Sequence, residues 1–355
     1  MRTVNERTGY LGLITLFATL SCSSCIGLSS LPTPPEQPKA GPGSSEKVAT
    51  EIRTTAVGAD AEKALIYEPA GITLETAPVI VFMHGYIGVN PKYYGAWIRH
   101  LVQRGNIVIF PMYQDSLIHT HEYTANAIAG IKRALAELHG GGHVTPDESR
   151  FAIVGHSLGC VIGLNVAAAA QAEGLPTVQA LLAANAGDAN NNSPHVPNIM
   201  TGDTNGISNE MLFLGVVGAD DTFVGETATL AIYDALSQLP QTNREVLRLY
   251  SDAHGSPALK ADHRAATSRD DAFDSGDNLI GSDGGDATGD ARGAFTVDAI
   301  DYYGYWKWFD ALSDAAFKNT NREYALGGGT NQTCVGAWSD GHSVKVAVRI
   351  QPSSE

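Results

Sequence analysis

The sequence predicts an α/β fold in which a largely parallel sheet is covered by helices. Two observations lead to this class. From about residue 62, short apolar runs rich in β-forming residues alternate with longer stretches of helical pattern. Several runs, such as VIVFM, NIVIF and MLFLGVV, are apolar without alternation, which is typical of strands buried on both faces. Strand–helix alternation of this kind favours right-handed crossovers between parallel strands.

The elements follow in chain order. The predicted strands are Ala64–Tyr67, Val79–Met83, Ile107–Pro111, Phe151–Val154, Val178–Ala183, Met211–Val217 and Val246–Tyr250. The predicted helices are Lys92–Gln103, His121–His139, Leu158–Ala172, Glu226–Leu239 and Asp298–Phe317. The tail that follows, GGGTNQTCVGAWSDGHSVKVAVRI, is a candidate for one added strand.

Two stretches interrupt this rhythm. Residues 185–209 are crowded with Asn, Gly and Pro and are interpreted as a loop. Residues 269–293 are acidic and rich in Gly. A calcium loop is one reading of the second stretch, but its spacing fails the EF-hand pattern and it contains no Glu. We therefore favour a solvated surface excursion and leave calcium binding as the alternative.

The N-terminus has the order of a secretory signal. Arg2 and Arg7 precede the apolar run Tyr10–Leu20, which leads into SCSSC. The run is shorter than the roughly 20 apolar residues of a spanning helix. We expect a signal peptide over residues 1–25, a flexible Pro/Gly/Ser linker over 26–48 and one catalytic domain over 49–355. The protein would then be secreted or held in a bacterial cell envelope, and a retained helix is a third reading.

Lipid anchoring and free secretion both stay open. Cys22 and Cys25 are candidates for lipidation after signal cleavage, which would tether the chain to a membrane. Cys160 and Cys334 remain in the rest of the chain, and we expect them to be unpaired. The net charge of −15 argues against nucleic acid as a partner. No metal-ligand spacing is apparent, so neither a metal nor another cofactor is expected.

The chemistry is indicated first by residues 155–159, GHSLG, which match G-x-S-x-G. The strand RFAIV precedes them, and a helix of small and apolar residues, CVIGLNVAAAA, follows. This is the setting of a nucleophile elbow, in which Ser157 stands on a sharp turn at a helix N-terminus. Upstream, VIVFMHGYIG ends a strong strand at a tight turn, so the backbone N–H groups of Tyr86 and Leu158 could form an oxyanion hole.

An orienting acid is expected at a strand end. MLFLGVVGADDTFVG runs a strand into an acidic pair, of which we choose Asp221, with Asp220 and Asp188 as alternates. EVLRLYSDAHGSPAL then runs a strand into His254, the predicted base. The fallback is His263, which we expect on a helix. The resulting order of nucleophile, acid and base is the one expected for an α/β-hydrolase.

Two other histidines have structural interpretations. His84 is expected to hold the oxyanion turn. His156 is expected to pack beside Ser157, because adjacent residues on a sharp turn point apart.

The chain resembles α/β-hydrolases, more narrowly bacterial secreted esterases of the polyester hydrolase, lipase and dienelactone-hydrolase-like type. The resemblance rests on VIVFMHGYIG, RFAIVGHSLGC, LFLGVVGADDTFVG and LRLYSDAHGSP, and covers roughly residues 60–265. It implies a mostly parallel sheet of about eight strands with helices on both faces. It also implies ester hydrolysis through a Ser157–Asp221–His254 triad. The tail after the histidine segment is longer than in secreted polyester hydrolases.

The substrate is expected to be a small-molecule or polymeric ester with an apolar acyl side. Tyr86, Ile87, Tyr113 and Phe223 follow strand ends near the predicted site and are candidates to line a cleft, ordinary packing being the alternative. The lack of an obvious lid insertion favours short or medium acyl chains, with polyesters and lipids as candidates. An amidase or peptidase on the same triad and a non-catalytic envelope binding protein of the same fold are the rival readings.

Overall fold

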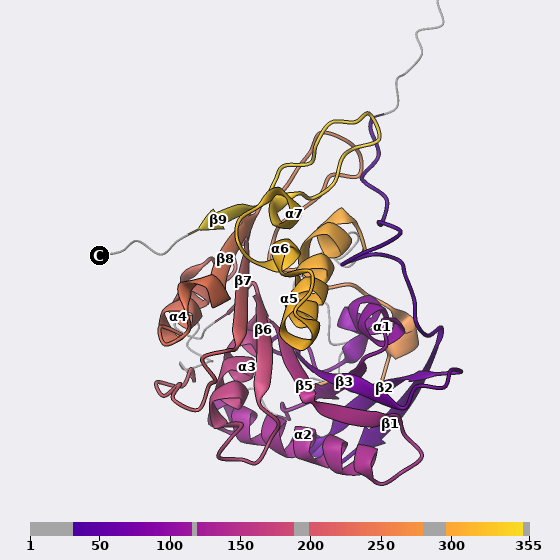
Figure 1. Cartoon of the computed structure of the whole chain (residues 1–355), viewed down its shortest axis with the longest axis vertical. Coiled ribbons are helices and arrows are strands. Elements are labelled where there is room, and N and C mark those ends of the chain that lie inside the picture. The colour runs from indigo at the N-terminus through magenta and orange to yellow at the C-terminus, as the bar shows by residue number, and fades with distance from the viewer. Residues whose placement is uncertain (1–30, 116–118, 188–198, 280–295, 351–355) are drawn as a thin grey trace, which may run out of the picture. The chain divides into compact units, whose positions relative to one another are not determined.

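A nine-stranded sheet forms the centre of the part that the structure describes, in the order β1-β2-β4-β3-β5-β6-β7-β8-β9 (Figure 1). The structure is a computed structural model, and it describes residues 31–115, 119–187, 199–279 and 296–350. The strands are β1 (Glu51–Val57), β2 (Ala64–Ala70), β3 (Thr76–Met83), β4 (Ile107–Pro111), β5 (Thr145–His156), β6 (Val178–Ala184), β7 (Leu212–Gly218), β8 (Arg244–Leu249) and β9 (Val348–Ile350).

The six strands from β3 to β8 are parallel to their neighbours within this set, while β1, β2 and β9 pair antiparallel at the two sides. The prediction of a mostly parallel sheet is confirmed. Every predicted strand is present, and β9 lies in the tail that was a candidate for an added strand. The sequence did not indicate β1, because this edge strand, EIRTTAV, contacts solvent along its length and lacks a continuous apolar run.

Helices cover both faces of the sheet (Figure 1). The longer ones are α1 (Gly95–Gln103) and α5 (Trp306–Lys318), which pack into one apolar core, and α2 (Tyr123–His139), α3 (Leu158–Ala169) and α4 (Thr227–Ala235), which pack into the other. Two helices of four residues, α6 (Arg322–Ala325) and α7 (Thr330–Thr333), follow. Short 3-10 turns occupy Asp60–Glu62, Pro91–Tyr94, Thr120–Glu122, Gln241–Asn243 and Asp271–Phe273.

Three predicted helices are divided in the structure, and one of them, His121–His139, becomes the 3-10 turn Thr120–Glu122 followed by α2. Lys92–Gln103 becomes a 3-10 turn followed by α1. Asp298–Phe317 becomes a π-helical turn, Asp301–Tyr305, followed by α5, and Gly304 within that turn has non-helical dihedral angles. π-Helical turns often occur near functional sites.

The strands explain why two cores exist. Successive side chains of a strand point to opposite faces, so Ile80 and Phe82 of β3 enter one core while Val79 and Val81 enter the other. All four are fully buried. Burial of each such side chain contributes about 1.5–3 kcal/mol, so the continuous apolar runs fix the strands in the middle of the layered fold.

The expectation of a flexible linker over residues 26–48 is wrong from Pro32 onward. The carbonyl of Pro32 accepts a hydrogen bond from the Ser256 N–H at 2.8 Å, and Thr33 and Ser339 exchange two hydrogen bonds. In Figure 1 this indigo segment runs beside the yellow loops of the C-terminal tail. Proline and glycine disfavour helices and strands here, but Pro35 is buried and the carbonyl groups of the segment accept hydrogen bonds from the domain. The predicted signal, with Cys22 and Cys25, lies outside the described residues.

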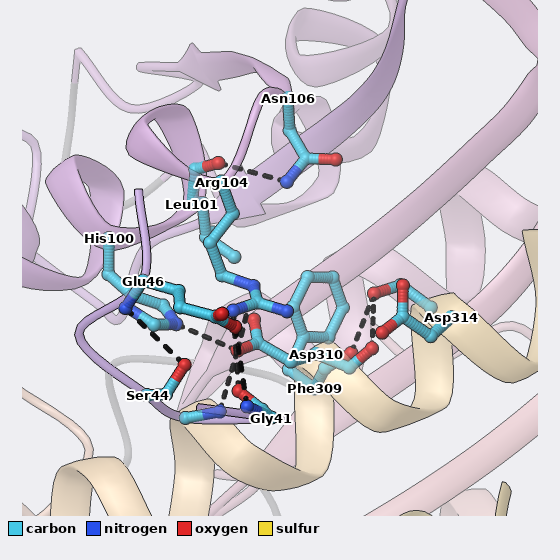
Figure 2. A network of polar contacts seen from close by, with 12 residues as sticks. Gly41, Ser44, Glu46, His100, Leu101, Arg104, Asn106, Phe309, Asp310 and Asp314 are labelled. Atoms are coloured by element: carbon cyan, nitrogen blue, oxygen red, sulfur yellow. Dashed lines mark hydrogen bonds and ion pairs between the residues drawn. The ribbon is translucent and has the colours of Figure 1, made fainter. Parts of the chain in front are cut away.

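A buried carboxylate holds the same segment further along (Figure 2). Asp310 of α5 is 3% exposed, and its Oδ2 accepts hydrogen bonds from the Gly43 N–H at 2.8 Å and from His100 Nε2 at 2.8 Å. Arg104 Nε lies 3.1 Å from the same oxygen. Burial alone would raise the pKa of Asp310, but His100 and Arg104 hold it below its ordinary value. The cluster therefore joins the N-terminal segment, α1 and α5.

The acidic stretch is described only over residues 269–279, where it is not a free excursion. Its carboxylates form ion pairs with basic residues elsewhere: Asp270 with Arg99 at 2.6 Å, Asp274 with Lys92 at 2.9 Å and Asp277 with Lys63 at 2.7 Å. Residues 280–293 lie outside the described part. Among the described residues, no group of three or more His, Cys, Asp or Glu side chains is arranged to hold a metal ion. In the same residues no helix is both long and apolar enough to cross a membrane, and Cys160 and Cys334 are unpaired.

Candidate active site

Ser157 alone connects β5 to α3, on a sharp turn with φ 53° and ψ −126°. Non-glycine residues rarely adopt positive φ, so the turn is strained. The two flanking glycines are required by backbone packing. A Cβ on Gly155 would lie 2.6 Å from the carbonyl oxygen of Gly159, and a Cβ on Gly159 would overlap the carbonyl of Met83. The predicted elbow is therefore present, and it holds Ser157 at the carboxyl end of the sheet.

Ser157 lies next to a histidine and an acid. His263 Nε2 is 3.0 Å from Ser157 Oγ, and His263 Nδ1 is 2.8 Å from Asp221 Oδ2. The other carboxylate oxygen, Oδ1, accepts the backbone N–H groups of Phe223 and Val224, each at 3.0 Å. Burial would raise the pKa of Asp221, but the hydrogen bond and charge of His263 and the two backbone donors lower it overall. Asp221 is thus kept ionised and orients the imidazole.

The prediction of His254 as the base is wrong, because the structure places a different histidine next to Ser157. His254 Nε2 is bonded to Asp340 Oδ2 at 2.8 Å, and its ring stacks on His342 with centroids 4.2 Å apart. After β8 the chain makes an excursion that is closed by a bridge between Asp252 and Leu259, and His254 lies within it. Only after this excursion does the chain come back to the carboxyl ends of the strands. There His263, the fallback residue, lies next to Ser157.

His263 lies on a turn and not on the expected helix. The turn is closed by Asp262, whose side chain accepts the Arg264 N–H at 2.9 Å and whose carbonyl accepts the Ala265 N–H at 3.1 Å. The alternate acid Asp220 is exposed, and its N–H donates to Ala261 O at 3.0 Å, which ties the acid's loop to the base's loop. The other alternate, Asp188, lies outside the described residues.

The two predicted oxyanion donors belong to backbone that borders Ser157. Leu158 is the first residue of α3, so its N–H has no preceding helical carbonyl to bond. Tyr86 follows Gly85, where an added Cβ would lie only 3.2 Å from Ser157 Cβ. On the other side a Cβ on Gly187 would lie 2.9 Å from Ser157 Oγ. Glycine at positions 85 and 187 thus lets the backbone approach Ser157 closely.

The loop of residues 84–87, which carries the predicted donor Tyr86 and is called the oxyanion loop below, has a strained backbone. Ile87 has φ 61°, which is a genuine outlier for a β-branched residue. Its N–H donates to Gln114 Oε1 at 2.8 Å, and this bond holds the loop in place. His84 at the start of the loop is fully buried, with Nδ1 2.7 Å from Gly85 O. Burial lowers the pKa of His84 to about 4, so the ring is neutral at ordinary pH.

The four residues predicted to line a cleft differ in their placement. Phe223 is 71% exposed, and its ring centroid is 4.9 Å from that of His263. Tyr86 and Ile87 are half-buried. Tyr113 is wrong for this role, because it is fully buried, stacks on His84 at 4.1 Å and donates its hydroxyl to the His84 carbonyl. The packing alternative therefore holds for Tyr113.

Comparison with known proteins gives one family. The family model described as Chlorophyllase matches residues 40–229, which is more than half of the chain. The matched part includes the oxyanion loop, Ser157 and Asp221, and it ends before His263. A search of curated proteins gives no match.

Proposed function

Because the chain belongs to the chlorophyllase family, an α/β-hydrolase-type serine esterase family, we propose that it hydrolyses carboxylic esters through an acyl-enzyme formed on Ser157. The observation that carries the proposal is the linked pair of contacts at His263, 3.0 Å to Ser157 Oγ and 2.8 Å to Asp221 Oδ2. A serine hydroxyl becomes a nucleophile when an adjacent base takes its proton, and that base needs an orienting partner.

In the acylation half-reaction, His263 takes the hydroxyl proton while Ser157 Oγ attacks the ester carbonyl. The backbone N–H groups of Tyr86 and Leu158 stabilise the oxyanion of the tetrahedral intermediate. His263 then gives its proton to the leaving alcohol, and the acyl group stays on Ser157. Asp221 holds the imidazole tautomer with Nδ1 protonated and stabilises the charged ring.

Deacylation repeats these steps with water. His263 deprotonates a water molecule that attacks the acyl-enzyme, and the same backbone donors stabilise the second tetrahedral intermediate. Ser157 leaves as the alkoxide and recovers its proton from His263. No further group is required for this reaction.

The exposed ring of Phe223 supports an apolar substrate group near the base. Together with the half-buried Tyr86 and Ile87, it would give an open apolar contact surface beside Ser157. We therefore expect short or medium acyl chains, with polyesters and lipids as further candidates. By its N-terminal sequence, the protein would be secreted or anchored in a bacterial cell envelope through Cys22 or Cys25.

The proposal is tested by hydrolysis of p-nitrophenyl esters from acetate to palmitate, using the chain without residues 1–25 and its Ser157→Ala variant. Activity that peaks at short chains and is lost in the variant supports a serine esterase with an open site. Labelling of Ser157 by a fluorophosphonate without activity on any ester would point to an amidase or peptidase, which matched anilides would then reveal. Absence of labelling and of ester turnover would contradict the proposal.

A further inference from the structure

The reaction above leaves one buried histidine of the elbow unused. His156 is 5% exposed and directly precedes Ser157. Its Nδ1 lies 2.9 Å from the hydroxyl oxygen of Tyr94, and its Nε2 lies 2.9 Å from the carbonyl oxygen of His263. The hydroxyl oxygen of Tyr94 also accepts the N–H of Gly85 at 2.9 Å. Two side chains therefore connect the backbone of the oxyanion loop to the backbone of the base.

The direction of these hydrogen bonds follows from elementary chemistry. Burial lowers the pKa of His156 to about 3, so its ring is neutral and carries one N–H. A carbonyl oxygen can only accept, so Nε2 carries that hydrogen and donates to His263 O. Nδ1 then accepts from the Tyr94 hydroxyl, which in turn accepts from the Gly85 N–H. Each donor has an acceptor, and no buried polar group along the path is left unpaired.

The same groups are packed tightly against the nucleophile. A Cβ on Gly85 would lie 3.1 Å from His156 Nδ1, 3.2 Å from the Tyr94 hydroxyl and 3.2 Å from Ser157 Cβ. Only glycine fits this position without displacing one of the three. Movement of the oxyanion loop would therefore displace the hydrogen-bonded chain and Ser157 together.

The base needs such support, because His263 lies on a turn and has no strand or helix to fix its backbone. Besides His156, its carbonyl oxygen is approached by Asn185 Nδ2 at 3.3 Å. A displacement of about 1 Å at a reacting group can reduce turnover about 100-fold. The contact between His156 and the His263 carbonyl therefore acts on the geometry of the reaction without touching substrate.

We propose that His156 and Tyr94 are positioning residues that link the oxyanion loop at Gly85 to the backbone of His263. This link keeps the base and the oxyanion donors in fixed positions relative to Ser157. This inference rests on the proposed function. It adds that the residue before the nucleophile sets the position of the base, and that a buried tyrosine connects it to the opposite side of the site.

The test uses the rate at which a fluorophosphonate inactivates the purified chain without residues 1–25. In that step Ser157 Oγ bonds to phosphorus, His263 takes the proton and fluoride leaves, so the rate reports the nucleophile, base and oxyanion donors without a known substrate. The kcat and KM for a p-nitrophenyl ester are measured in parallel. The variants are Tyr94→Phe, His156→Gln and His156→Leu, with Tyr302→Phe as the control. Tyr302 donates its hydroxyl to Pro35 O at 2.5 Å, in a contact between the N-terminal segment and the π-helical turn.

We expect Tyr94→Phe to lower the inactivation rate and kcat about 10-fold and His156→Leu about 100-fold, with KM unchanged within about 2-fold. His156→Gln should recover most of the loss, because its amide N–H can still donate to the His263 carbonyl. The double variant Tyr94→Phe/His156→Leu should be no worse than His156→Leu, since linked groups are not additive. Tyr302→Phe should keep the wild-type rate.

Tyr94→Phe with the rate of Tyr302→Phe would overturn the inference, and so would His156→Gln no faster than His156→Leu. Thermal unfolding identifies any variant that is not folded at the assay temperature. If His156→Leu does not fold, the comparison of Tyr94→Phe with Tyr302→Phe decides alone. If the wild-type chain is neither labelled nor active on esters, the proposed function fails instead, which separates the two failures.

Discussion

The side chain of Asn185 accepts a hydrogen bond from the backbone N–H of Gly218, with Oδ1 3.0 Å from the nitrogen. The same oxygen accepts the Tyr305 hydroxyl at 3.1 Å, while Nδ2 donates to Asp262 O at 2.8 Å and to His263 O at 3.3 Å. All four hydrogen bonds that an amide side chain can make are thus present. Asn185 thereby joins the strand that leads to the acid, the turn that carries the base and the π-helical turn before α5.

Replacement of Asn185 by Ala should therefore reduce both stability and turnover. It leaves several buried polar groups without partners, at about 1–3 kcal/mol each for those that stay buried. It also puts Ala at φ 49°, a conformation that Asn tolerates better. Urea unfolding and kcat are measured together, with Asn165→Ala as the control. Asn165 also makes three partly buried hydrogen bonds, but on α3 and with Thr124, Ile199 and Thr201. If both variants lose stability and keep kcat, Asn185 has no role in positioning the base.

The two histidines that follow β8 should differ sharply on substitution. His263→Ala removes the group next to Ser157 Oγ and should lower kcat about 10⁶-fold, as expected for triad members that act as a unit. Asp221→Asn should lower kcat about 10⁴-fold, because it disturbs the tautomer. His254→Ala removes the contact with the exposed Asp340 and the ring stacking on His342, both away from Ser157, and should keep kcat within about 3-fold of wild type. Ester turnover of the three purified variants checks this, and the reverse ranking of the histidines would contradict the site.

The comparison of these histidines shows what the sequence could predict. Ser157 and Asp221 follow β5 and β7 closely, and strand ends were recognisable from continuous apolar runs. The excursion that carries His254 away depends on contacts between distant parts of the chain, such as the bond of Ser256 N–H to Pro32 O and the pair of His254 with Asp340. Local pattern does not contain such contacts.

The same limit explains two other errors. Tyr113 follows the end of β4, as a residue lining the cleft would. Its place in the sequence, however, does not show whether its side chain points to the site or into the core. The Pro-rich segment has the composition of a linker. Its attachment depends on Tyr302, Asp310 and Ser339, which lie far along the chain. The Pro/Gly/Ser content of a segment indicates that it forms no helix or strand. It does not show whether distant residues of the domain bind the segment.

The close contact of α3 with the end of β3 predicts a strong effect of substitution at Gly159. Gly159→Ala would drive a Cβ into the carbonyls of Met83 and His84, which are backbone atoms that cannot rotate away. We expect a loss of about 1–3 kcal/mol or more in the free energy of unfolding, measured by urea denaturation. Gly202→Ala is the control, because no atom lies within 4 Å of a Cβ there and φ is not positive. Equal stabilities for both variants would contradict the tight elbow.

The segment from Pro32 to Ser45 should stabilise the domain through Asp310. Asp310→Ala leaves His100, Arg104 and the Gly43 N–H without their buried acceptor (Figure 2). Breaking a buried ion pair from one side costs about 3–5 kcal/mol, so the thermal unfolding temperature should fall by several degrees or more. Removal of residues 1–45 should also lower it, whereas removal of residues 1–30 serves as the control. An unchanged unfolding temperature after removal of residues 1–45 would restore the linker interpretation.

His84 and His156 should each reduce stability as the pH drops from about 6.5 toward 4, while Asp298 and Asp301, whose pKa values burial raises, act in the opposite direction over the same range. Burial lowers the pKa of His84 to about 4 and that of His156 to about 3, from the ordinary histidine value of 6.5. Between these values and 6.5 each of the two rings binds more protons in the unfolded chain than in the folded chain, so each contributes a decrease in the free energy of unfolding with decreasing pH. Asp310, whose folded pKa is lowered, adds a loss in the same direction only below about pH 4. Urea unfolding of the wild type and of His156→Gln at pH 7.5, 6.5, 5.5 and 4.5 isolates the contribution of His156, and the stability of the variant relative to the wild type should increase as the pH falls. A pH dependence that is unchanged in His156→Gln would mean that His156 is not held neutral, and the direction of hydrogen bonding from Gly85 to His263 would then have to be reversed or abandoned.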